Sequence, residues 1–197
     1  MKKINNLAVF CGASRGNKNI YADVASEFAE LLVQSQITLV YGGAEVGLMG
    51  VIADRVLALG GSVIGVIPEA LKAREIAHKG LTELHVVNSM HERKSLIAKL
   101  ADGFVMLPGG VGSLDEFFEI FTWMNLGIHN KPCGILNVDN YFESLINFLK
   151  IMITNDFMKK QYLDSIVIEK NPQLLLEQFK QYQHSIFSRW EDVKVSA

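Results

Sequence analysis

Short apolar runs alternate with longer amphipathic stretches along this chain. The runs are rich in β-branched and aromatic residues, as strands are, and lie at residues 7–10, 37–41, 62–67, 84–87, 104–107, 133–138 and 165–168. The stretches are long enough to cross back over a sheet and lie near residues 18–35, 47–59, 89–101, 113–127, 141–155 and 172–186. Because each run is apolar throughout, both faces of the sheet must be covered. The pattern predicts an α/β fold with a doubly wound parallel sheet and helices on both faces.

The length and charge of the chain narrow its class. With 197 residues, 49% of them apolar, residues 1–197 fit one domain, and we expect a flexible tail after about residue 185. The formal net charge is −2 without blocks of like charge, so we expect no nucleic-acid partner and no membrane partner. No run of eighteen apolar residues occurs, and the apolar run at residues 7–11 is too short for a secretion signal. We therefore expect a cytoplasmic protein.

Cofactor and metal chemistry have little support in the sequence. Cys11 and Cys133 lie far apart in apolar settings, which favours buried thiols, and the five histidines are not spaced as metal ligands. The dinucleotide pattern GxGxxG is missing because three residues separate Gly12 from Gly16, and the P-loop pattern is missing because no lysine follows Gly47. The sequence predicts neither a metal nor a cofactor.

Glycine gathers where predicted strands turn into predicted helices, in CGASRG (11–16), YGGAEVGLMG (41–50) and LPGGVGSLDE (107–116). Ligands of doubly wound sheets bind at this edge. Glycine lets a ligand approach the backbone, and the start of the next helix offers unpaired N–H groups with a partial positive charge. The turns therefore predict a phosphate site, with candidate binding residues Gly12, Ser14, Gly43, Gly109 and Gly110.

The third turn also has an ordinary structural interpretation. Ser113-Leu114-Asp115-Glu116 matches a capping box, which predicts Ser113 as the N-cap of a helix and Glu116 at its third position. By that interpretation Glu116 only stabilises the helix, by about 1 kcal/mol. Residues 108–112 stay unexplained, because three of these five loop residues are glycines, which carry an entropy cost.

Two cations follow the fourth predicted strand. Ser89-Met90-His91-Glu92 is a second capping box, and Arg93 and Lys94 follow it in the first turns of the helix, where the helix dipole disfavours positive charge. A nearby anion would offset that cost. We expect the fourth and fifth strands to be neighbours, which would bring both cations, the glycine loop and Glu116 to one edge. A solvated helix face remains the alternative interpretation of the two cations.

The motifs MHERK (90–94) and PGGVGSLDE (108–116) together resemble those of the LONELY GUY family, the cytokinin riboside 5′-monophosphate phosphoribohydrolases. YGGAEVGLMG and GIHNKP add to a likeness that runs from residue 11 to about residue 170. The family pattern pairs MHxRK with PGGxGTxxE, and Ser113 replaces its threonine but keeps the hydroxyl. The resemblance implies a Rossmann-like fold and a homodimer. Nothing in these residues supports the label lysine decarboxylase, which the family often carries.

The resemblance also implies a reaction and its residues. An adenosine 5′-monophosphate with an N6 side chain would be cleaved at its N-glycosidic bond, giving free base and ribose 5-phosphate. Arg93 and Glu116 match the catalytic pair, and Glu116 would stabilise an oxocarbenium-like transition state and orient water. Arg93 would fix the phosphate together with Lys94, and an additional role in polarising the ribose or the leaving group stays open. Gly110, Gly112 and Ser113 would form the phosphate cradle with Lys94 beside the phosphate. Glu75 and Thr122 match further ligand-contacting positions.

Two other functions and one structural question stay open. The same fold could serve a nucleosidase that acts on unmodified AMP, or a carrier that binds a nucleotide or cofactor without cleaving it. The segment FFEIFTWMNL (117–126) is apolar on nearly every face, with Glu119 its one charged residue. Such a helix is either interior or faces another chain, so we expect dimerisation through it.

Overall fold

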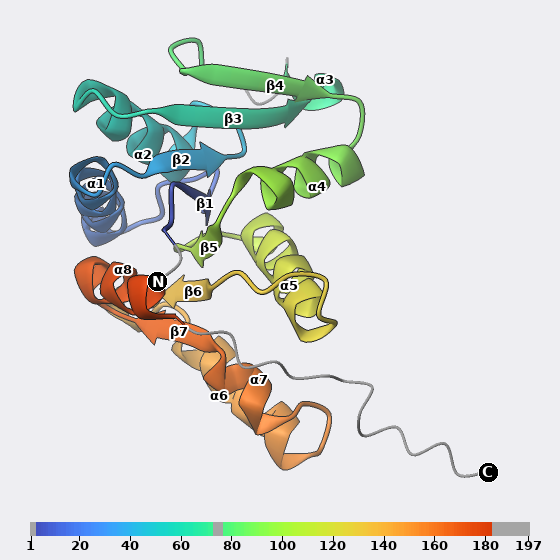
Figure 1. Ribbon diagram of the computed structural model, residues 1–197. Helices are drawn as coiled ribbons and strands as arrows, with labels where there is room; N and C mark the ends of the chain where they lie inside the picture. The colour runs from blue at the N-terminus through green and yellow to red at the C-terminus, as the bar shows by residue number, and fades with distance from the viewer. Residues whose placement is uncertain (1–2, 73–76, 183–197) are drawn as a thin grey trace.

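The computed structural model describes residues 3–72 and 77–182. Seven parallel strands form one sheet in the order β4-β3-β2-β1-β5-β6-β7 (Figure 1). Their bounds, which lie close to the predicted runs, are β1 Asn6–Phe10, β2 Thr38–Tyr41, β3 Val63–Pro68, β4 Glu83–Val87, β5 Gly103–Met106, β6 Cys133–Leu136 and β7 Ile166–Glu169. Glu75 and the tail expected after residue 185 lie outside the described residues, as does the end of the last predicted helix.

Helices cover both faces of the sheet, so the predicted Rossmann-like, doubly wound architecture is confirmed. One face packs against α1 (Asn19–Gln34), α2 (Gly47–Ala58) and α8 (Pro172–Gln181). The other packs against α4 (Met90–Leu100), α5 (Val111–Asn125), α6 (Glu143–Thr154) and α7 (Lys160–Asp164). The short helix α3 (Glu69–Lys72) and the 3-10 turn η1 (Val138–Asn140) complete the described elements, and the sequence predicted neither of these two nor α7. None of the helices in the described part of the chain has the length and apolarity to cross a membrane.

Side chains of the central strand β1 point alternately to the two faces of the sheet, and the hydrophobic core accordingly has two parts. In β1, Leu7 and Val9 face α1 and α2, while Ala8 and Phe10 face α4 and α5. All four are nearly inaccessible to solvent, which explains why the strand is apolar at every position. Cys11 continues the strand as a buried thiol, as predicted.

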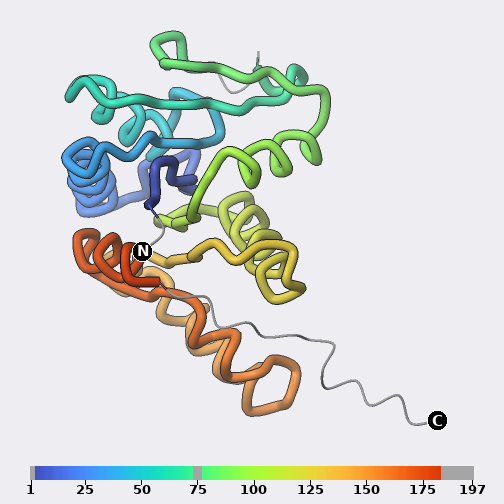
Figure 2. Tube along the Cα trace, viewed as in Figure 1, coloured from blue at the N-terminus to red at the C-terminus, as the bar shows by residue number. Residues whose placement is uncertain are grey.

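The expectation that the fourth and fifth strands are neighbours is wrong. β4 lies at one edge of the sheet, and β3, β2 and β1 separate it from β5. The winding reverses after β4, and α4 carries the chain back over β3, β2 and β1 before β5 begins (Figure 2). The switch point of the sheet therefore lies between β1 and β5, where the connections leave toward opposite faces.

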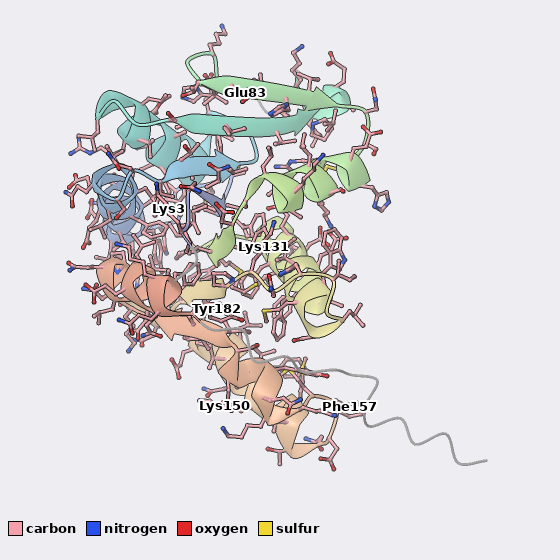
Figure 3. All side chains as sticks on the ribbon, viewed as in Figure 1. Lys3, Glu83, Lys131, Lys150, Phe157 and Tyr182 are labelled. Carbon is pink, nitrogen blue, oxygen red and sulfur yellow. The ribbon has the colours of Figure 1, made fainter. Side chains whose placement is uncertain are left out.

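The segment GIHNKP has a structural role at the far end of α4. The Lys131 ammonium donates hydrogen bonds of 2.6 Å to the carbonyl oxygens of Ala98 and Ala101 (Lys131 is labelled in Figure 3). These carbonyls belong to the last turn of α4, where a cation also complements the helix dipole. Lys131 thus ties down the helix whose first turn carries Arg93 and Lys94.

Candidate active site

A cavity of about 440 Å³ opens at the switch point, beyond the carboxyl ends of β1 and β5. Ligands of doubly wound folds bind at this place. The connection from β1 to α1 supplies one wall, and the connection from β5 to α5 supplies another. The lining residues are Gly12, Ala13, Ser14, Arg15, Gly16, Tyr21, Leu48, Pro108, Gly109, Gly110 and Tyr141.

The capping box predicted at Ser113 is wrong. Helix α5 begins at Val111, with Gly110 as its N-cap, so Ser113 lies inside the first turn and Glu116 in the second. The reason is packing: Ser113 is buried beneath the loop, and a Cβ on Gly109 would lie 2.2 Å from its Oγ. No side chain caps this helix start, which leaves its first N–H groups to other acceptors.

Glycine is required at only one of the three glycine positions of this loop, 109, 110 and 112. Gly109 is required by its close packing on Ser113. Gly110 has an ordinary extended backbone, and added Cβ atoms on Gly110 and Gly112 would meet nothing within 4 Å. Folding therefore does not require glycine at these two positions. The open space they leave at the helix start is consistent with close approach of a ligand.

Arg93 and Glu116 meet although their helices follow distant strands. One guanidinium nitrogen of Arg93, Nη1, lies 3.2 Å from Oε1 of Glu116, and both side chains are largely buried. The Arg93 Nε donates to the carbonyl oxygen of Val66 at 3.0 Å, and Nη2 donates to that of Gly42 at 3.4 Å. The ends of β3 and β2 thus fix the guanidinium, which in turn fixes the carboxylate.

Gly42 makes room for this arrangement. A Cβ at position 42 would lie 2.1 Å from Nη2 of Arg93, which is too close for any pair of unbonded atoms. Position 42 therefore requires glycine because the Arg93 side chain fills the space, and not because of a turn. Sequence analysis placed a ligand at this glycine-rich segment and did not anticipate that a side chain of the protein fills the space.

Lys94 lies beside Arg93 but has different partners. Its ammonium is 2.7 Å from Asp115 and 3.1 Å from Glu119, both on α5. Partial burial acts to lower the pKa of Lys94, but hydrogen bonds and charge from the two carboxylates outweigh it and raise the pKa. The interpretation of Lys94 as part of a solvated helix face is therefore wrong. The unfavourable cation at the start of α4 is offset by acidic residues of α5.

The N-cap Ser89 predicted by the second capping box is confirmed, although the return hydrogen bond to Glu92 comes from the residue before the cap. The Ser89 hydroxyl accepts a hydrogen bond of 3.1 Å from the Glu92 N–H, and the Glu92 carboxylate accepts one of 2.7 Å from the Asn88 N–H. This cap fixes the first turn of α4 and with it the direction in which Arg93 leaves the helix.

The buried pair and the cavity are two parts of one edge. Neither Arg93 nor Glu116 lines the cavity, but Gly110, the N-cap of α5, does, and the second turn of α5 carries Glu116. Burial raises the pKa of the Cys11 thiol, which follows β1, and the nearby charge of Glu116 raises it further. Glu116 is thus close to the end of the strand that leads into the cavity wall.

The remaining predicted residues divide into three groups. Gly12 and Ser14 line the cavity. Gly43 does not: it has a positive φ of 82° and packs against Ile67, so its conformation accounts for the glycine. Thr122 is exposed on α5 and donates to the Phe118 carbonyl oxygen at 2.7 Å.

The cavity residues that the sequence did not single out include Arg15, Tyr21 and Tyr141. Arg15 lies inside the glycine-rich turn CGASRG, and a positive charge in a predicted phosphate site is a signal for a phosphate-binding residue. Tyr141 follows β6, after a connection without glycine, and only the sheet order brings it to the switch point.

The fold and this edge define a class, the Rossmann-like α/β proteins with a site at the carboxyl end of a parallel sheet. Solved structures agree on the fold. The molybdenum cofactor binding protein of Rippkaea orientalis has a TM-score of 0.68 and 18% identity, with 92% of this chain and 98% of that chain covered. The molybdenum cofactor carrier protein of Chlamydomonas reinhardtii has a TM-score of 0.68 and 15% identity, covering 89% and 96%. At these identities the likeness concerns the fold alone.

Sequence relatives identify the family. A family model described as "Possible lysine decarboxylase" matches residues 49–179. A cytokinin riboside 5′-monophosphate phosphoribohydrolase from Rhodococcoides fascians is 46% identical over 167 residues, 84% of each chain. One from Arabidopsis thaliana is 42% identical over 180 residues, 91% of this chain and 84% of that protein. The chain belongs to the LONELY GUY family of cytokinin riboside 5′-monophosphate phosphoribohydrolases, as its motifs indicated.

Proposed function

We propose that this protein hydrolyses the N-glycosidic bond of N6-substituted adenosine 5′-monophosphates and releases the free base and ribose 5-phosphate. Relatives that are 41–46% identical carry the name of this activity. The observation that carries the proposal is the buried contact of 3.2 Å between Arg93 and Glu116, which is the sixth residue of a helix whose start has no side-chain cap. A carboxylate held in place beside an anion site is the arrangement that cleavage of a phosphorylated sugar needs.

The phosphate is assigned to the start of α5. Within the described residues no protein acceptor takes the N–H of Gly110, and the open space at Gly110 and Gly112 allows close approach. Arg15 lines the same cavity and supplies a positive charge there. Binding energy from the phosphate would then hold the ribose in place against Glu116.

Glu116 is proposed to act on the sugar. Its carboxylate would stabilise the positive charge that develops near C1′ as the bond to the base breaks, and it would orient or deprotonate the attacking water. Arg93 keeps this carboxylate in place through the contact described above. The direct contacts of Arg93 and Lys94 with phosphate stay predictions, since the structure gives both cations carboxylate partners.

Incubation of the purified protein with N6-isopentenyl-AMP and with AMP tests the proposal. Equal amounts of free base and ribose 5-phosphate from the first substrate, at a higher kcat/KM than from AMP, are expected. Faster cleavage of AMP would instead identify a nucleosidase for unmodified nucleotides. Binding of either nucleotide without any product would identify a carrier, and would refute the proposed hydrolysis.

We further propose a homodimer located in the cytoplasm. Most of the predicted dimer helix is accounted for inside the chain, because Phe117, Ile120 and Phe121 of α5 are buried. The exposed apolar residues that favour a second copy lie instead on α6, where Phe148 and Ile151 are each about half exposed. Light scattering during size-exclusion chromatography at micromolar concentration would give the dimer mass, whereas a monomer mass would refute this proposal.

A further inference from the structure

Tyr141 contacts the glycine loop at residues 108–112 but belongs to neither of the two connections that form most of the cavity wall. It stands between η1 and α6 and lines the cavity, and its hydroxyl donates a hydrogen bond of 2.7 Å to the carbonyl oxygen of Gly109. The sheet order is what allows this, because β6 lies next to β5 and its connection reaches the same edge. Tyr141 is thus a side chain of one connection that holds the backbone of another.

The bond acts on the most adaptable peptide unit in the loop. A peptide between two glycines can rotate with little steric resistance, because both flanking residues accept φ of either sign. All peptide bonds in the described residues are trans, so the Gly109 C=O and the Gly110 N–H point in opposite directions. By holding the carbonyl, the Tyr141 hydroxyl also decides where the Gly110 N–H points.

We propose that Tyr141 is a positioning residue that fixes the Gly109–Gly110 peptide with its N–H toward the nucleotide phosphate. The inference rests on the proposed function, in which that N–H meets the phosphate. A rotated peptide would present the carbonyl oxygen to the phosphate, and the two negative groups would repel each other. The hydrogen bond from Tyr141 disfavours the rotated peptide before the ligand binds. The entropy cost of ordering the peptide therefore does not reduce the binding affinity.

The turn that presents Tyr141 is strained and strongly fixed. Asp139 and Asn140 have positive φ of 50° and 59°, which costs energy in residues other than glycine. The buried Asn137 side chain compensates by accepting from the Phe142 N–H at 2.8 Å. Lys18 of the first connection adds an ion pair with Asp139 at 2.6 Å. A turn held in this way delivers the tyrosine in one orientation.

The ring of Tyr141 is placed independently of its hydroxyl. It packs edge to face on Tyr21, with 5.6 Å between ring centroids, and on Phe142, with 4.8 Å. Phenylalanine at position 141 would keep both contacts and lose only the hydrogen bond to Gly109. The substitution Tyr141→Phe therefore isolates the proposed effect.

The test compares Tyr141→Phe with Tyr162→Phe, which removes a buried hydroxyl that has no hydrogen-bond partner among the described residues. For N6-isopentenyl-AMP, Tyr141→Phe should raise KM about three- to tenfold, the range expected for one hydrogen bond, and change kcat less than twofold. Calorimetry with ribose 5-phosphate should show the same loss of affinity. Tyr162→Phe should change neither quantity, and both melting temperatures should stay within a few degrees of wild type.

Two results would overturn the inference while leaving the proposed function intact. One is unchanged KM and unchanged affinity for ribose 5-phosphate in Tyr141→Phe when the wild type cleaves the nucleotide. The other is an equal loss of affinity for N6-isopentenyladenosine, which has no phosphate. If the wild type cleaves neither nucleotide, the proposed function fails, but calorimetry with ribose 5-phosphate still decides the role of Tyr141.

Discussion

The buried pair of Arg93 and Glu116 and the rim at Gly110 both involve α5 but are built in opposite ways, with Gly110 as the N-cap of this helix and Glu116 in its second turn. Around Arg93 every polar contact is made within the chain, and the glycine beside it, Gly42, is required because the guanidinium fills its side-chain space. Around Gly110 the space is open, the helix start has no cap, and folding does not require glycine. One region makes its contacts within the chain, and the other leaves open space at the start of a helix.

The difference separates two kinds of glycine that look alike in a sequence. A glycine that packs against the chain makes substitution costly for stability, whereas a glycine that borders open space makes substitution costly for binding. Under the proposed function, the buried pair is a preformed catalytic part and the rim is the proposed docking place of the substrate. Four substitutions, taken from the largest expected effect to the smallest, test this division.

Glu116→Gln should have the largest effect. The amide keeps the size of the side chain but loses the negative charge that favours the oxocarbenium-like transition state, so turnover should fall at least ~100-fold while the nucleotide still binds. Steady-state kinetics and calorimetry measure the two effects. Glu177→Gln, an exposed change on α8, is the matched control and should behave as wild type. Turnover of Glu116→Gln equal to wild type would remove Glu116 from the mechanism.

Gly42→Ala should disturb the buried pair by displacing the Arg93 guanidinium. The added methyl would stand 2.1 Å from Arg93 Nη2, so the guanidinium must move and release Glu116. We expect a loss of about 1–3 kcal/mol in the free energy of unfolding, as for overpacked cores, together with at least tenfold lower kcat. Urea unfolding and kinetics on the same preparation measure both. Wild-type stability and kcat would show that Arg93 adapts freely and is not fixed by Gly42.

Gly110→Ala should show the opposite pattern. Its φ of −93° suits alanine and no atom lies within 4 Å of the new Cβ, so the free energy of unfolding should stay within about 0.5 kcal/mol of wild type. KM for the nucleotide should rise several-fold because the methyl occupies space assigned to the phosphate. A KM equal to that of wild type would place the phosphate elsewhere.

Lys94→Met should have the smallest effect, measured as a change in the free energy of unfolding, which isolates the carboxylate contacts of Lys94 from its predicted phosphate contact. The Lys94 ammonium bridges two carboxylates, and its loss should cost about 1 kcal/mol near neutral pH. Because folding raises the pKa of Lys94, its contribution is fully present below the usual lysine pKa and is lost as pH rises through the folded value. The difference between wild type and variant should therefore shrink in urea unfolding at strongly alkaline pH. A difference that grows with pH would contradict the assigned pKa direction.

The sequence predicted the sheet well because its strands are buried on both faces and read as plain apolar runs. The Ser89 cap was also predictable, since a capping box is a local pattern. The same pattern failed at Ser113, where packing of the serine under Gly109 moved the helix start to Val111. Local rules describe a helix end only where no tertiary contact competes.

The site was predicted partly for a wrong reason. Arg93 and Glu116 were expected to meet across neighbouring strands, but the meeting depends on α4 crossing back over three strands of the sheet. The path of α4 depends on the order of the strands in the sheet, and so does the position of Tyr141 at the cavity. Local sequence patterns do not predict strand order. Individual residues were thus easier to predict than the geometry that joins them.

A crystal structure of Glu116→Gln with N6-isopentenyl-AMP bound would test the central claim most directly. The account predicts the 5′-phosphate within hydrogen-bond distance of the Gly110 N–H and C1′ of the ribose facing residue 116. A nucleotide bound with its phosphate away from the start of α5, or with its sugar turned away from residue 116, would contradict it.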